Sequence, residues 1–126
     1  MEKTVAIVGA SNRRKKFGNK AVRAFLQAGW TVYPVNPKED EVEGLHCYKS
    51  IKDVPQPIER ISMYVSPAVG KSMLDELCET HHQELWFNPG AADMELINLS
   101  KKLGLNPVQD CSIVAIGFSP GMFPDS

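Results

Sequence analysis

Short apolar runs alternate with longer amphipathic stretches along the chain. The runs are rich in β-branched residues and end at glycine, proline or a polar turn, which is typical of buried strands. The amphipathic stretches carry apolar residues at helical spacing. The predicted strands are residues 4–8, 31–35, 45–48, 60–65, 84–87 and 106–109. The predicted helices are residues 18–28, 67–80 and 93–103, with one helical turn at 50–54.

The alternation of strands and helices predicts an α/β fold, a Rossmann-like three-layer domain with a parallel sheet and helices on both of its faces. A length of 126 residues suits a single domain, and we find no repeat or linker. Pro34 lacks the N–H that a sheet ladder uses, so the strand 31–35 is predicted to lie at an edge or to end there. We expect the core to span about 4–111. Residues 112–126 form an apolar tail with several glycines and prolines, which we expect to pack on the surface or on a partner.

The composition is that of an ordinary globular protein. Hydrophobic residues make up 43% and charged residues 23% of the sequence. We see neither a stretch long enough to cross a membrane nor a signal peptide. The three cysteines lie far apart, which argues against a disulfide framework. We therefore predict a cytoplasmic protein with no membrane partner.

Charge is distributed unevenly along the chain. Residues 1–38 hold eight basic side chains and one acid, whereas residues 39–126 hold six basic and fourteen acidic ones. A positive first third indicates a local anionic ligand, with a solvated basic surface as the alternative. The basic run from Arg13 to Lys16 lacks the interleaved aromatic residues that stack on bases, so we expect no nucleic-acid partner.

Turn residues suited to ligand binding follow four of the predicted strands. In open parallel sheets, ligands bind beyond the carboxyl ends of the strands, where the strand order reverses. Glycine lets the backbone approach phosphate oxygens, and the amides that begin the next helix donate hydrogen bonds to them. Each turn alone is ordinary turn chemistry, but together they predict a binding edge. The turn residues are Gly9, Ala10 and Ser11, then Asn36, Pro37 and Lys38, then Ser66 and Pro67, then Asn88, Pro89 and Gly90.

The first turn departs from the usual dinucleotide signature. That signature has three closely spaced glycines and an acidic residue about 20 positions further on. Here no glycine follows Gly9 until Gly18, and the second strand ends in Asn36. Both departures argue against NAD. Lys38 and the basic run favour a ligand with an additional phosphate, which leaves NADP and 3′-phosphorylated coenzyme A (CoA) open.

Longer motifs bear on the choice between NADP and CoA. They are Val-Ala-Ile-Val-Gly-Ala-Ser at 5–11, Val-Tyr-Pro-Val-Asn-Pro at 32–37, Gly-Leu-x-x-Tyr-x-Ser-Ile at 44–51 with Val54-Pro55 after it, Trp-Phe-x-Pro-Gly at 86–90, Gly104-Leu105 and Asp110-Cys111. These motifs resemble the stand-alone CoA-binding proteins, which are similar to the nucleotide-binding domain of the succinyl-CoA synthetase alpha subunit. The motif at 32–37 is the most specific, and the resemblance covers nearly the whole chain.

The resemblance implies a five-stranded Rossmann core with CoA or acyl-CoA lying across the strand ends. It implies these contacts: Gly9, Ala10 and Ser11 with the phosphates, next to Arg13 of the basic run; Asn36, Pro37 and Lys38 with the adenosine end; Ser66 and Pro67 with the adenine or pantetheine; and Gly90 at the far side.

The resemblance also bears on activity. The ligases of this kind transfer phosphate through a histidine in a separate domain, for which this chain has no room. No nucleophile stands at readable spacing from a base. We therefore expect non-catalytic binding of a small nucleotide ligand, as a sensor or carrier. Two alternatives stay open: an NADP-dependent oxidoreductase, and an interaction protein without a ligand that uses its apolar tail to form a homodimer or to dock.

A cysteine–histidine cluster and a single cysteine could indicate metal binding or a reactive thiol. Cys78, His81 and His82 could indicate a metal, but adjacent histidines near a helix end point in different directions and no second ligand cluster accompanies them. We predict a solvated helix end there and no metal site. Cys111 is predicted to be a small core residue, with a reactive thiol as the alternative.

Overall fold

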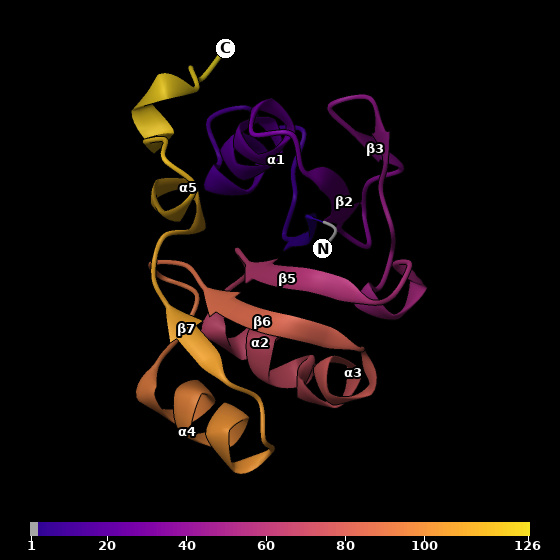
Figure 1. The fold of residues 1–126 in the computed structure, drawn as a ribbon, viewed down its shortest axis with the longest axis vertical. Helices are drawn as coiled ribbons and strands as arrows, with labels where there is room; N and C mark the ends of the chain where they lie inside the picture. Colours follow the sequence, from indigo (N-terminus) through magenta and orange to yellow (C-terminus); the bar gives the residue numbers. More distant parts are fainter. Residues whose placement is uncertain (1–2) are drawn as a thin grey trace.

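The computed structural model describes residues 3–126, and its central feature is a parallel sheet with helices on both faces (Figure 1). Five strands form this sheet in the order β2-β1-β5-β6-β7, and every neighbouring pair is parallel. The predicted α/β, Rossmann-like fold is confirmed. The strands are β1 (Thr4–Val8), β2 (Thr31–Val35), β5 (Ile58–Met63), β6 (His82–Phe87) and β7 (Pro107–Gln109). The helices are α1 (Phe17–Gln27), α2 (Pro67–Ser72), α3 (Leu74–Glu79), α4 (Met94–Lys102) and α5 (Ser112–Ala115).

The core lies on both faces of β1, as its uninterrupted apolar run predicts. All of its side chains are buried and alternate between the two faces. Ala6 and Val8 belong to the core formed with α3 and α4, whereas Val5 and Ile7 belong to the core formed with α1. Figure 1 shows α2, α3 and α4 below the sheet and α1 and α5 above it.

The region after β2 differs from the prediction of one strand at 45–48. It forms a small antiparallel hairpin of β3 (Glu41–Val42) and β4 (Leu45–His46). Glu43 and Gly44 both have positive φ, the conformation of a tight hairpin turn. Tyr48, at the end of the predicted strand, makes one isolated bridge to Val35 of β2. The order of the strands places β2 at the edge, as Pro34 predicted.

The helix predicted over 67–80 is two helices, α2 and α3, separated at Met73. The Met73 amide donates to the carbonyl of Gly70, and this bond tightens and ends α2. The Ser72 hydroxyl donates to the carbonyl of Val69 at 2.6 Å and so competes with the helical backbone. Glycine and serine both weaken a helix at this point.

The tail packs against α1. It forms α5 and then a 3₁₀ turn, Pro120–Met122. Ile113 and Phe123 are buried in the same core cluster as Val22 and Phe25 of α1. The buried core therefore extends beyond residue 111. None of the helices described for residues 3–126 has the length and apolar character needed to cross a bilayer.

Candidate functional site at the carboxyl edge of the sheet

Two adjoining hollows lie at the carboxyl edge of the sheet. The first hollow, of about 340 Å³, is lined by the start of α1, the end of β5 and the turn after β6. The second hollow, of about 330 Å³, is lined by the end of β2, the turn before β5 and α2. Gly9 and Val65 line both hollows, and they follow β1 and β5. The strand order reverses between these two strands, so the hollows meet at the switch point where such sheets bind ligands.

Two glycines allow close backbone contacts at the carboxyl edge of the sheet. Gly9 has a φ of +93°, and a Cβ there would lie 2.8 Å from the carbonyl oxygen of Tyr64. A Cβ at Gly18 would lie 2.2 Å from the carbonyl oxygen of Gly9. Since no side chain fits at either distance, Gly9 lets the ends of β1 and β5 lie close together, and Gly18 lets the start of α1 lie against the turn after β1.

The amino end of α1 borders the first hollow. Its first residues, Phe17 and Gly18, line the hollow together with Lys15 and Lys16. The first amides of a helix have no acceptor within the helix and carry the positive end of its dipole. The first turn holds no acidic side chain, and the Lys16 side chain makes no capping hydrogen bond. The first hollow is therefore suited to an anion such as a phosphate group.

The second hollow is more apolar. Ile51, Val69 and Met73 contribute to its walls, and Lys49 lies at its border. The Lys49 ammonium lies 2.8 Å from a carboxylate oxygen of Asp40, and this hydrogen bond lowers the pKa of that carboxyl. Glu76 also lines this hollow, so its walls are mostly apolar with one cation and one carboxylate, which suits a planar or aliphatic group.

The structure brings part of the predicted site together. Gly9, Asn36, Pro37, Ser66 and Gly90 line one or the other hollow. The residues outside the lining are Ala10, Ser11, Arg13, Lys38 and Pro67.

Two of the predicted polar side chains hold the turns in place. The Asn36 amide nitrogen donates to the carbonyl of Ala10 at 2.8 Å, and its oxygen accepts from the Lys38 amide at 2.9 Å. This joins the turn after β2 to the turn after β1. The Ser66 hydroxyl accepts from the Val69 amide at 3.3 Å and caps α2. These side chains shape the edge of the sheet.

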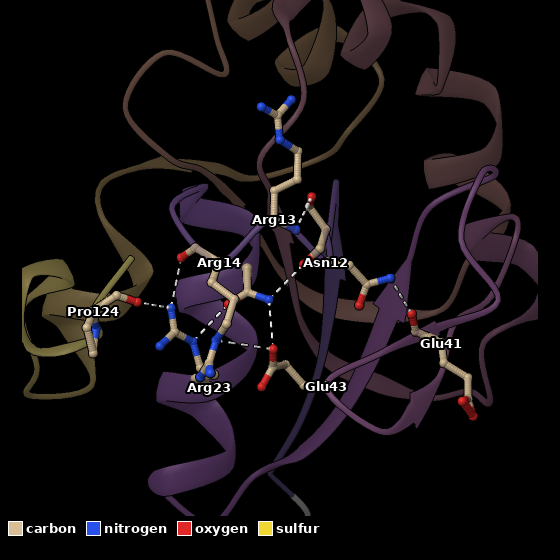
Figure 2. Close-up of polar contacts among 9 residues, drawn as sticks. Asn12, Arg13, Arg14, Arg23, Glu41, Glu43 and Pro124 are labelled. Atoms are coloured by element: carbon tan, nitrogen blue, oxygen red, sulfur yellow. Dashed lines mark hydrogen bonds and ion pairs between the residues drawn. The ribbon is translucent and has the colours of Figure 1, made fainter. Parts of the chain in front are cut away.

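The basic run after β1 divides into side chains with different surroundings. Arg14 Nε lies 3.6 Å from Glu43 Oε2, and Arg13 points away from this pair (Figure 2). Lys15 and Lys16 line the first hollow. The sequence assigned the basic run as a whole to the ligand and named only Arg13 as a contact, because an irregular loop has no periodicity that tells which side chains turn inward.

A buried polar network fixes the turn after β6. Asn88 donates through its amide nitrogen to the Ser62 hydroxyl at 2.8 Å and to the carbonyl of Met63 at 2.9 Å. Its amide oxygen accepts from the Ser112 backbone amide at 2.8 Å. The Ser62 hydroxyl donates to the Ser112 hydroxyl at 2.8 Å, and all three polar side chains are buried. The network joins β5, β6 and α5, and so holds Gly90 at the wall of the first hollow.

Tyr64 forms another part of that wall. Its hydroxyl is buried, and it has no hydrogen-bond partner within residues 3–126. Burial raises the pKa of this phenol above its ordinary value.

The region around His82 holds no metal cluster. The His82 Nδ1 atom lies 2.7 Å from the carbonyl of Thr80. Across residues 3–126, the structure shows no group of three or more His, Cys, Asp or Glu side chains that could hold a metal ion.

Comparison with known proteins identifies the family. The sequence profile described as "CoA binding domain" matches residues 3–117, which is most of the chain. The chain belongs to the CoA-binding domain family.

Relatives of this CoA-binding domain include stand-alone proteins and parts of larger enzymes. The uncharacterized protein YneT of Bacillus subtilis is 27% identical over 111 residues, covering 88% of this chain and 82% of YneT. The acetate–CoA ligase (ADP-forming) of Methanocaldococcus jannaschii is 38% identical over 74 residues, covering 59% of this chain but 10% of the ligase. A conserved hypothetical protein from Pyrococcus furiosus has a similar structure, with a TM-score of 0.81 and 35% identity over 91% of this chain and 99% of that one.

The sequence of this CoA-binding domain carried one signal for its most constrained contact. Gly18 lies in the first turn of α1, where glycine costs helix stability, so a packing reason for it could have been expected. The partner atom, the carbonyl oxygen of Gly9, could not be inferred without the fold.

Proposed function

We propose that this protein binds CoA or acyl-CoA without catalysing a reaction, as a sensor or carrier. The observation that carries this is the meeting of the two hollows at Gly9 and Val65, at the switch point of the sheet. One hollow has a helix amino end and two lysines, and the other has largely apolar walls. CoA joins a nucleotide to a long arm through phosphates, so it needs both kinds of surface side by side.

The proposed pose places the phosphates of CoA at the turn after β1 and at the start of α1. The residues proposed to contact or border the ligand are Gly9, Ala10, Ser11 and Arg13 with Lys15 and Lys16 at the phosphates; Asn36, Pro37 and Lys38 at the adenosine end; Ser66 and Pro67 beside the adenine or pantetheine; and Gly90 at the far side. Ala10 is fully buried and its carbonyl accepts from the Asn36 amide, so its part would be to hold the turn that borders the ligand.

We also propose a cytoplasmic location. Cys47, Cys78 and Cys111 are free thiols, which suits a reducing compartment. The homodimer expected as an alternative stays a prediction, which light scattering on the purified protein tests. The ligase activity of the longer relatives is not part of what we propose for this chain.

Isothermal titration calorimetry with CoA, acetyl-CoA, dephospho-CoA, NADP and NAD tests the function. We expect binding of the two CoA species, weaker binding of dephospho-CoA, and little binding of NAD. Affinity should fall as salt rises, because charged groups contribute. A folded protein that binds none of the CoA species would refute the proposal. Preference for NADP, together with hydride transfer, would favour the oxidoreductase instead.

Lys38 provides a finer test of the adenosine end. Lys38 is exposed next to the turn that Asn36 holds. We expect Lys38→Ala to weaken the binding of CoA more than that of dephospho-CoA, because only CoA carries the 3′-phosphate. An equal loss for both ligands would place Lys38 away from that phosphate.

A further inference from the structure

Two side chains of α1 hold the loop between β1 and α1 by hydrogen bonds. The Asn19 amide nitrogen donates to the carbonyl of Ser11 at 2.8 Å, and Arg23 Nη2 donates to the carbonyl of Arg14 at 2.9 Å. Arg23 Nε also donates to the Asn19 amide oxygen at 2.8 Å. The two side chains lie one helical turn apart and brace each other. They hold the loop at its beginning and immediately before Lys15.

The same guanidinium holds the tail of the chain (Figure 2). Arg23 Nη2 donates to the carbonyl of Pro124 at 2.9 Å, and the buried ring of Phe123 lies 5.9 Å from the guanidinium. One turn earlier on α1, the Lys20 ammonium lies 2.7 Å from a carboxylate oxygen of Asp125. This contact lowers the pKa of Asp125. Two side chains of α1 therefore seat residues 123–125.

These contacts give the guanidinium a single orientation. The Nη2 atom carries two hydrogens, and one bonds to the loop while the other bonds to the tail. Because the group is planar and its Nε is also bonded, the orientation that the tail carbonyl helps to fix is the one that aligns Nη2 with the loop carbonyl. A lysine ammonium at the same position has no such planar fork.

We propose that Arg23 is a positioning residue for the phosphate end of the CoA site, through which docking of the tail fixes the loop that carries Lys15 and Lys16. This rests on the proposed function, because those lysines line the first hollow. The tail thereby acts on ligand affinity although it does not line either hollow.

Charge reversal at Asp125 tests the link and leaves Phe123 in the core. Asp125→Lys should repel Lys20 and Arg23 and lift residues 124–125 off α1. The new positive charge would by itself favour an anionic ligand, so weaker binding has the opposite sign to a simple charge effect. Asp75→Lys on α3 is the matched control, because Asp75 is exposed and changes the net charge equally on the other face of the sheet.

Two measurements on the full chain test whether docking of the tail fixes the loop. Calorimetry gives the Kd for CoA, and amide hydrogen exchange of residues 12–16 in the ligand-free protein reads the loop directly. We expect Asp125→Lys and Arg23→Lys each to raise the Kd about tenfold, as loss of one charged hydrogen bond would, and to speed exchange of the loop. The double variant Arg23→Lys/Asp125→Lys should bind CoA no more weakly than Arg23→Lys alone, because the tail acts through Arg23. The control should change neither quantity.

The outcomes separate this inference from the proposed function. Unchanged exchange and unchanged Kd in Asp125→Lys, with CoA bound by the unmodified protein, would overturn the link and leave the function standing. Additive losses in the double variant would also overturn it, as would equally faster exchange in β1, since that reports global destabilisation. If the unmodified protein binds no CoA, the function fails, while faster exchange confined to the loop in Asp125→Lys would still support the link.

Discussion

Position 18 tolerates no side chain, because a Cβ there would lie 2.2 Å from the carbonyl oxygen of Gly9. Helix propensity alone favours Gly18→Ala by about 1 kcal/mol. We expect the opposite sign, a loss of about 3 kcal/mol in the free energy of unfolding, because the contact is with backbone that cannot turn aside. Urea denaturation measures the difference. Gly121→Ala is the control: it meets nothing within 4 Å and should change stability by less than about 0.5 kcal/mol.

Lys15 and Lys16 are exposed, and their contribution to CoA affinity should depend on their place at the first hollow. We expect the double variant Lys15→Ala/Lys16→Ala to raise the Kd for CoA about tenfold and to flatten its salt dependence. Lys101→Ala/Lys102→Ala removes the same charge from the exposed end of α4 and should leave the Kd nearly unchanged. Calorimetry at several salt concentrations compares the pairs. An equal loss in both would mean that net charge alone attracts the ligand.

At the scale of elements, the buried network around Asn88 joins β5, β6 and α5. Asn88→Ala would leave the Ser112 amide without its acceptor in a buried place. We expect a loss of about 2 to 3 kcal/mol in the free energy of unfolding. Asn98→Ala, on the exposed surface of α4, is the matched control and should be nearly neutral. Equal stabilities for the two variants would show that the network contributes nothing.

The elements were predictable where burial alone decides them. The strands at 4–8 and 31–35 agree with the structure residue for residue, since their apolar runs had one explanation. The break between α2 and α3 was missed, because it depends on a side-chain bond from Ser72 to a backbone carbonyl. The two-strand hairpin at 41–46 was missed for a similar reason, since a two-residue strand carries no periodic pattern. Local hydrogen bonds decide such features, and hydrophobic periodicity does not report them.

At the scale of the whole molecule, the sequence predicted the edge at which the hollows lie but not all of their walls. The rule that the ends of parallel strands gather at one edge is enough to bring Gly9, Asn36 and Gly90 together. The rule does not say which side chains from other layers close the space. Met73 of the linker between α2 and α3 is one of these, and its place depends on how the helices pack.

Because the two hollows are built from α1, α2 and the ends of four strands, the site should exist only in the fully folded chain. Bound CoA should then stabilise the whole molecule, raising the free energy of unfolding by about 2.7 kcal/mol at a concentration 100 times its Kd. Urea unfolding at several CoA concentrations measures this, and the calorimetric Kd predicts the entire dependence without adjustment. The slope of the unfolding free energy against urea should stay constant, since the folded state does not change in extent. Equal stabilisation by NAD, or none at saturating CoA, would contradict a CoA site formed by the folded sheet.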